Sequence, residues 1–159
     1  MCLYNPKQIT TDKDIVCYKI LRKVNDDTYV SPYFPKKTKK WILNKTKKTK
    51  NINIYYPHGL NNADYISNAF HSLKTIQDVL HYSDDILASA LNSQDYFVFK
   101  CVIPKSSVIY EGLCIGIFVT TGYASNQIKP IELICPIKEI KFSNEYINFC
   151  YENLLGINS

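Results

Sequence analysis

The sequence lacks the motifs that mark several large enzyme classes. It contains no GxSxG, HExxH, P-loop or GxGxxG pattern, so the nucleophile-elbow hydrolases, the HExxH zinc proteases and the common nucleotide-binding loops are not indicated. Its six cysteines form no CxxC pair and no group with metal-ligand spacing. Several lie inside apolar runs, so we expect free, buried and reduced thiols, and no metal site.

Long apolar runs are also absent. No run approaches the roughly 18 residues that a membrane-spanning helix requires. The first residues, Met-Cys-Leu-Tyr-Asn-Pro, lack the basic start and apolar core of a signal peptide. We therefore expect a soluble cytoplasmic protein with no membrane partner.

Arginine is nearly absent, whereas lysine is concentrated in one segment. Arg22 is the only arginine among 19 basic residues, and eight lysines lie in residues 36–50 without an acidic residue. Since the whole chain carries +5, the remainder is mildly acidic. We interpret 36–50 as a basic loop or insertion. It is either a solvated loop or a non-specific nucleic-acid site, in which Trp41 stacks on a base and Lys39, Lys40, Lys47 and Lys48 contact phosphates.

The apolar pattern predicts one α+β domain over residues 1–159. We expect a mostly antiparallel, strongly bent sheet of about six to eight strands with two or three helices. Residues 15–23 read as a strand with both faces partly buried, and 96–103 as the strongest strand. Further strands are expected at 51–56, 108–110, 114–119, 131–135 and 139–142, with a turn at 120–123. Helices are expected at 76–91 and after Ser143, a predicted N-cap.

A polar group is predicted where a short strand meets the first helix. His71 and Ser72 end the strand, and Thr75 precedes the helix with Asp78 three residues further on, the spacing of a capping box. Such a junction can hold a phosphate or a ribose, because the helix N-terminus attracts anions. The alternative is a plain N-cap with His71 packed beside it.

A second polar group precedes and enters a late strand. Tyr123, Asn126 and Gln127 are candidate ligand contacts, and Glu132 is a candidate general base or ribose-binding carboxylate. The alternative is a loop followed by an alternating strand, in which Glu132 faces water.

The order of these segments resembles short, largely uncharacterised proteins of gut bacteria and their phages. The resemblance covers most of the chain except the lysine segment. It is carried by the segments MCLY, DIVCYKIL, FHSLKTIQDVLHY, VFKCVIPKSSVIYEG and YASNQIKPIEL. It implies a phage or mobile-element accessory protein, located in the host cytoplasm if a phage encodes it, but no particular activity.

A weaker resemblance is to the ADP-ribosyltransferase-like fold. Tyr18 and Lys19 on a first strand, His71 and Ser72 before a helix, and Glu132 on a late strand follow the order of the NAD-contacting residues of that fold. The sequence departs from the pattern in three ways. A lysine replaces the first-strand arginine or histidine, the serine motif is stretched before Thr75, and Glu132 lacks a paired glutamine or glutamate.

Three functions remain open at this stage. The first is an accessory protein that binds a nucleotide-type ligand or a host protein on a transferase-like scaffold. The second is an active transferase using NAD as its cofactor, in which Lys19 contacts a phosphate, His71 and Ser72 position the ribose, and Glu132 stabilises the transition state. The third is the nucleic-acid binder described above.

Overall fold

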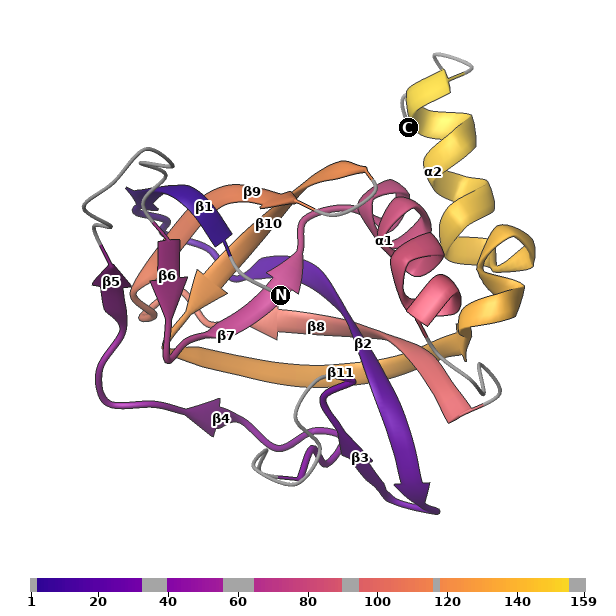
Figure 1. The fold of residues 1–159 in the computed structure, drawn as a ribbon, viewed down its shortest axis with the longest axis horizontal. Helices are drawn as coiled ribbons and strands as arrows, with labels where there is room; N and C mark the ends of the chain where they lie inside the picture. The colour runs from indigo at the N-terminus through magenta and orange to yellow at the C-terminus, as the bar shows by residue number, and fades with distance from the viewer. Residues whose placement is uncertain (1–2, 33–39, 56–64, 90–94, 116–117, 155–159) are drawn as a thin grey trace.

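The computed structural model describes residues 3–32, 40–55, 65–89, 95–115 and 118–154 (Figure 1). The strands are β1 (Leu3–Ile9), β2 (Ile15–Asn25), β3 (Thr28–Val30), β4 (Lys47–Lys48), β5 (Asn53–Tyr55), β6 (Tyr65–Ser67), β7 (Phe70–Leu73), β8 (Tyr96–Ile103), β9 (Ile109–Ile115), β10 (Val119–Ser125) and β11 (Gln127–Pro136). The helices are α1 (Ile76–Ser89), the 3₁₀ helix η2 (Ile137–Phe142) and α2 (Asn144–Leu154).

The strands form one bent sheet in which every described pair is antiparallel. The order is β4-β11-β8-β2-β7-β10-β9-β1-β6-β5, and β3 pairs with β2. Helices α1 and α2 lie together beside the sheet (Figure 1). The predicted α+β class with a mostly antiparallel, bent sheet is therefore confirmed. The sheet has more strands than expected because several, such as β4, span only two or three residues.

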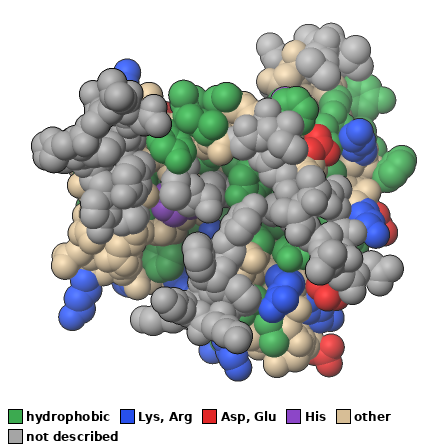
Figure 2. Space-filling view, viewed as in Figure 1, with side chains coloured by type: hydrophobic (Ala, Val, Ile, Leu, Met, Phe, Trp, Pro, Cys, Tyr) green, Lys and Arg blue, Asp and Glu red, His purple; other side chains and the backbone are tan. Residues whose placement is uncertain are grey.

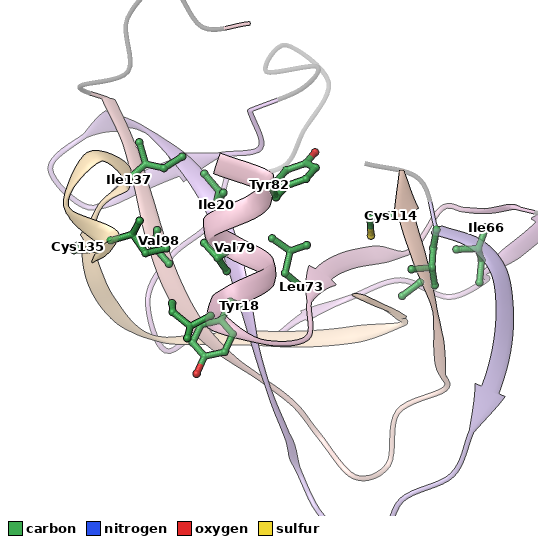
Figure 3. Packing of buried hydrophobic residues seen from close by; sticks show 14 residues of the cluster. Tyr18, Ile20, Ile66, Leu73, Val79, Tyr82, Val98, Cys114, Cys135 and Ile137 are labelled. Carbon is green, nitrogen blue, oxygen red and sulfur yellow. The ribbon is translucent and has the colours of Figure 1, made fainter. Parts of the chain in front are cut away.

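Strand β2 is buried on both faces, as its sequence predicts. Tyr18 and Ile20 belong to the core cluster under the helices, and Cys17 and Leu21 belong to a second cluster on the opposite face. The alternation follows from the period of two in a β-strand. Figure 3 shows the first cluster, in which side chains from β2, β7 and β8 surround α1.

The predicted capping box at the start of α1 is present. Asp78 Oδ2 accepts hydrogen bonds from Thr75 N at 2.9 Å and Thr75 Oγ1 at 2.7 Å, and Asp78 N donates to Thr75 Oγ1 at 3.1 Å. Asp78 also accepts from Thr121 N and Thr121 Oγ1, both at 3.0 Å. One carboxylate therefore caps α1 and fixes it to β10. Ser143 is confirmed as the cap of α2, because its Oγ accepts from Tyr146 N at 3.2 Å.

The predicted single strand at 114–119 is wrong, because β9 ends at Ile115 and the antiparallel β10 begins at Val119. Two further predicted elements at the end of the sheet are also wrong. Residues 120–123, predicted as a turn, lie inside β10, which is held between β7 and β9. Residues 139–142, predicted as a strand, belong to η2. Both segments are too short for their apolar pattern to distinguish a strand from a turn or a helix. Pairing with β7 and β9 decided the first, and packing decided the second. Strand β1, which pairs with β6 and β9, was not predicted.

Two glycines allow β9 and β10 to lie very close to the backbones of their neighbours β1 and β7. Gly112 on β9 and Gly122 on β10 lie opposite each other. A Cβ atom on Gly122 would lie 2.6 Å from Ser72 O, and one on Gly112 would lie 2.6 Å from Tyr4 O. No side chain fits at either position without a shift of the backbone, which explains the glycines there.

The cysteines of the described chain are free thiols. Cys17, Cys101, Cys114 and Cys135 are buried, and Cys150 is partly buried. Cys17 and Cys101 lie opposite each other on β2 and β8. Burial raises the pKa of the Cys17 thiol to about 12 and that of Cys101 well above its usual value, so these two thiols remain protonated at neutral pH and pack as small apolar side chains.

The contacts of Asp78 predict that this carboxylate contributes more to the free energy of unfolding than an ordinary helix cap does. We expect Asp78→Ala to lower the free energy of unfolding by about 2–4 kcal/mol, because it removes the cap and both bonds to Thr121. Denaturant unfolding measures the change. Asp84→Ala, at an exposed position of the same helix, is the control and should change stability by less than about 0.5 kcal/mol. Equal effects of the two variants would contradict this role.

Candidate functional site

Lys19 is a buried ammonium group near the centre of the sheet. Its residue is 8% exposed. Its Nζ donates to the His71 carbonyl at 2.5 Å and lies 4.9 Å from the centre of the Trp41 ring. No carboxylate of the described chain forms an ion pair with it. Burial lowers the pKa of Lys19, because desolvation penalises the charged form.

Ser72 is the buried polar side chain beside Lys19. Its Oγ has no oxygen or nitrogen partner among the described residues, and it neighbours the Cys17 thiol, whose pKa it lowers by hydrogen bonding. His71 Nδ1 also lacks a partner among the described residues, but His71 pairs with Ala124 and lies on the same face of β7 as Leu73, so its ring lies on the opposite face and only its carbonyl contacts Lys19. Tyr18 pairs with Leu73, so the next pair along the two strands is Lys19 and Ser72, whose side chains share a face. A hydroxyl both donates and accepts, so Ser72 Oγ keeps hydrogen-bonding capacity beyond its contact with the thiol.

His71 is neutral at physiological pH. Burial, and then the charge of Lys19, lower its pKa to about 3. The imidazole therefore carries no charge near neutral pH, and the basic groups beside Trp41 in the described chain are Lys19 and Lys47.

A segment that we call the strap, residues 40–50, covers this cluster. Trp41 and Tyr29 exchange two backbone hydrogen bonds of 2.7 and 3.1 Å. Further along, Asn44 N donates to Pro130 O at 2.8 Å, Thr49 N donates to Asn126 O at 2.9 Å, and β4 pairs with β11. The described part of the predicted basic loop is thus attached to the sheet. Residues 36–39, including Lys39, lie outside the described residues.

Trp41 is part of the core. It is 4% exposed and contacts Phe70 edge to face with ring centres 5.7 Å apart. Both Lys19 Nζ and Lys47 Nζ lie over its ring, Lys47 at 4.4 Å. The buried ring is not available to stack on a nucleic-acid base, and its cation contacts stabilise the two lysines instead.

The cluster continues toward the surface through Tyr123. This residue lies opposite Ser72 on β7 and opposite Glu111 on β9. Glu111 forms an ion pair with Lys74, and this hydrogen bond raises the pKa of Lys74. The face around Lys19 therefore contains a tyrosine and an ion pair at its edge, which the sequence did not place together.

Glu132 and Tyr18 lie on the other face of the sheet. Glu132 is opposite Lys100, and Lys100 is opposite Tyr18. The Tyr18 hydroxyl donates to Glu145 Oε1 at 2.6 Å, and Lys100 Nζ lies 3.2 Å from the same oxygen. A cavity of about 340 Å³ beside this group is lined by Glu132, Ile134, Cys135, Glu139, Phe142, Ser143, Asn144 and Glu145.

The structure therefore divides the predicted site residues. Lys19, Ser72 and Tyr123 come together on the face that the strap covers, whereas His71 contributes its backbone carbonyl and its ring lies on the other face. Glu132, Tyr18 and Leu73 lie in one line of paired residues across the strands. Lys19 and Ser72 lie in the next line. Since successive residues of a strand point to opposite faces, Glu132 and Ser72 do not share one cleft.

The remaining candidates hold the backbone. Thr75 caps α1. Asn126 Oδ1 accepts from Val108 N at 2.9 Å, and Gln127 pairs with Lys48 in the β4–β11 ladder. Trp41, predicted to stack on a base, instead covers Lys19, and the role of Glu111 as the partner of Lys74 was not predicted. A single tryptophan inside the lysine segment and a lysine inside an otherwise apolar strand were the available signals.

Burial of His71 predicts a pH effect on stability. The unfolded imidazole has a pKa of about 6.5 and the folded one about 3. Between these values the unfolded state binds more protons, so stability falls as the pH decreases from 6.5 toward 3. We expect His71→Gln to lose less stability than the wild type over this range in denaturant unfolding. His81→Gln is the control and should follow the wild type; parallel curves for all three proteins would contradict the assignment.

Comparison with family models, curated proteins and solved structures finds no match to this chain. No helix among the described residues is long and apolar enough to cross a membrane. Within the same residues, no group of three or more histidine, cysteine, aspartate or glutamate side chains is arranged to hold a metal ion.

Proposed function

We propose that the protein is a non-enzymatic binding protein that holds a small phosphate-bearing ligand of the nucleotide type beside Lys19 and Ser72. The observation that supports this most is a buried Lys19 side chain with no ion-paired carboxylate in the described chain, next to the buried Ser72 hydroxyl, whose polar neighbour is the Cys17 thiol. A phosphate oxygen would accept from both groups. Unpaired buried polar groups are costly in an ordinary core.

The strap gives the ligand a route to this cluster. Its attachments to the sheet are the bond pair at Trp41, single bonds from Asn44 and Thr49, and the two-residue β4 ladder. A ligand would displace only the part around Trp41, which costs less than opening a central strand. In the bound state, the phosphate would replace the contact of Lys19 with the Trp41 ring.

Binding rather than catalysis fits the arrangement of the other groups. Glu132, which an NAD-dependent transferase would need beside the ribose, faces away from Ser72. The Cys17 thiol has a raised pKa and His71 a lowered one, both caused first by burial. Neither is poised to act as a nucleophile or a proton acceptor near neutral pH.

Thermal unfolding with a panel of NAD, ADP-ribose, cyclic nucleotides and inorganic phosphate tests the proposal. A ligand at 100 times its Kd stabilises the folded state by about 2.7 kcal/mol, which corresponds to roughly 5–10 °C for a chain of this size. We expect Lys19→Met to abolish the shift while remaining folded, because a buried charge can be replaced by an apolar side chain of similar size. Lys105→Met, at an exposed position, is the matched control.

The pH dependence gives an independent readout. An anion favours the charged form of Lys19, so binding raises its lowered pKa and takes up a proton. The affinity should therefore weaken as the pH rises through the pKa of free Lys19. Absence of a shift with every compound, or an equal shift in Lys19→Met, would refute the proposal. Conversion of NAD that Glu132→Gln abolishes would establish the transferase instead.

A protein partner is the second candidate, and the β9–β10 hairpin is the observation that favours it. Ile115 is 59% exposed and Val119, directly opposite, 62%. Leu113 and Phe118 are also exposed. Figure 2 shows apolar side chains gathered over this part of the molecule. Adjacent exposed apolar groups of this kind often mark a protein interface.

Affinity capture from cells of the source tests this candidate. We expect a stoichiometric partner that the double variant Ile115→Glu, Val119→Glu loses, because a charge in the centre of an apolar interface is not compensated. Val16→Glu, Val24→Glu is the control, since both valines are similarly exposed on β2. Loss of the partner from both double variants, or from neither, would exclude the hairpin as the interface.

A further inference from the structure

The strap carries a group of exposed lysines that the proposed ligand site does not use. Lys40, Lys45, Lys48 and Lys50 are exposed, and we call them the lysine ridge. Their segment, residues 40–50, contains no acidic residue. None of the four forms an ion pair with another described residue. Their charges are therefore presented to solvent without internal compensation.

The ridge is held on a fixed backbone. Its segment is attached to β3 through Trp41 and to β11 through Asn44, Thr49 and the β4 ladder. Lys47 has a different role from its neighbours, because its Nζ donates to Lys40 O at 3.1 Å and lies over the Trp41 ring. Lys47 thus helps to hold the strap, while the four ridge lysines project from it.

The surroundings of the ridge favour a polyanion. Figure 2 shows basic side chains at the lower left of the molecule, on the side where Figure 1 places β4, while the acidic side chains along the lower edge lie further right. Lys48 and Lys50 are two residues apart. Both are exposed and close in the chain, which suits contacts with neighbouring negative groups of a polyanion.

We propose that the lysine ridge binds the phosphate backbone of single-stranded nucleic acid, independently of base sequence. Lysines neutralise phosphates as point charges, and the association is driven by the release of counterions. Direct reading of bases is not expected from this surface: the segment contains no arginine, and Trp41 is buried beneath it. The interaction is separate from the ligand site proposed at Lys19.

Fluorescence anisotropy with a labelled 20-nucleotide single-stranded DNA of mixed sequence tests this inference. If all four ridge lysines contact phosphates, log K should fall with log salt with a slope of about −3. We expect the variant with Lys40, Lys45, Lys48 and Lys50 all changed to Gln to bind at least tenfold more weakly at about 50 mM salt, with a slope near zero. Lys19→Met should bind the DNA as the wild type does.

A matched control has the same change in net charge at other sites. Lys13, Lys105, Lys138 and Lys141 are exposed lysines outside the strap, and their fourfold change to Gln should leave the slope near −3. Circular dichroism and thermal unfolding establish that both variants are folded. Equal loss of binding in the two variants, or no binding by the wild type at 50 mM salt, would overturn the proposal. So would tighter binding to vesicles containing phosphatidylserine than to the DNA, which would identify a lipid surface as the partner.

Discussion

The burial of β2 on both faces is the constraint on which the rest of the structure depends. One face of the strand packs under α1 and α2, and the other packs under Trp41 and the strap. Because alternate residues serve the two faces, Lys19 has no route to solvent along the strand. Its ammonium group is satisfied by a backbone carbonyl and an aromatic ring rather than by a carboxylate. This is an unfavourable place for a charge in an ordinary core, and it distinguishes the site from the surrounding apolar packing.

The same alternation separates the polar residues into two groups with different chemistry. Around Lys19 the groups are a buried hydroxyl and protonated thiols, and the carboxylate at the edge of this face, Glu111, is paired with Lys74. Around Tyr18 the groups are glutamates with Lys100 between them, and Glu145 accepts from both neighbours. An anion is favoured on the first face and disfavoured on the second. A reaction that needs both Ser72 and Glu132 would require the register of one strand to shift by one residue. That shift would expose all the apolar side chains that the strand now buries.

The strap takes part in both proposed anion-binding sites. It buries Trp41 against Lys19, and it presents the lysine ridge outward from the same short segment. Lys47 contacts the ring from this segment, so the tryptophan is shared between a core lysine and a strap lysine. A residue that reads in the sequence as a surface aromatic among lysines is instead the anchor that keeps these charges on a fixed backbone.

The sequence by itself determined the features that depend on near neighbours. The α+β class, the capping box of Thr75 and Asp78, the Ser143 cap and the double burial of β2 follow from local spacing and from the period of the apolar pattern. Only the tertiary structure decided which face each polar residue occupies, because strand register is fixed by pairing between distant segments such as β2 with β8 and β11 with β8. It also decided that 120–123 continues a strand, since β7 and β9 supply its partners. The burial of Trp41 depends on Tyr29 and Phe70, which are distant in sequence and adjacent only after folding.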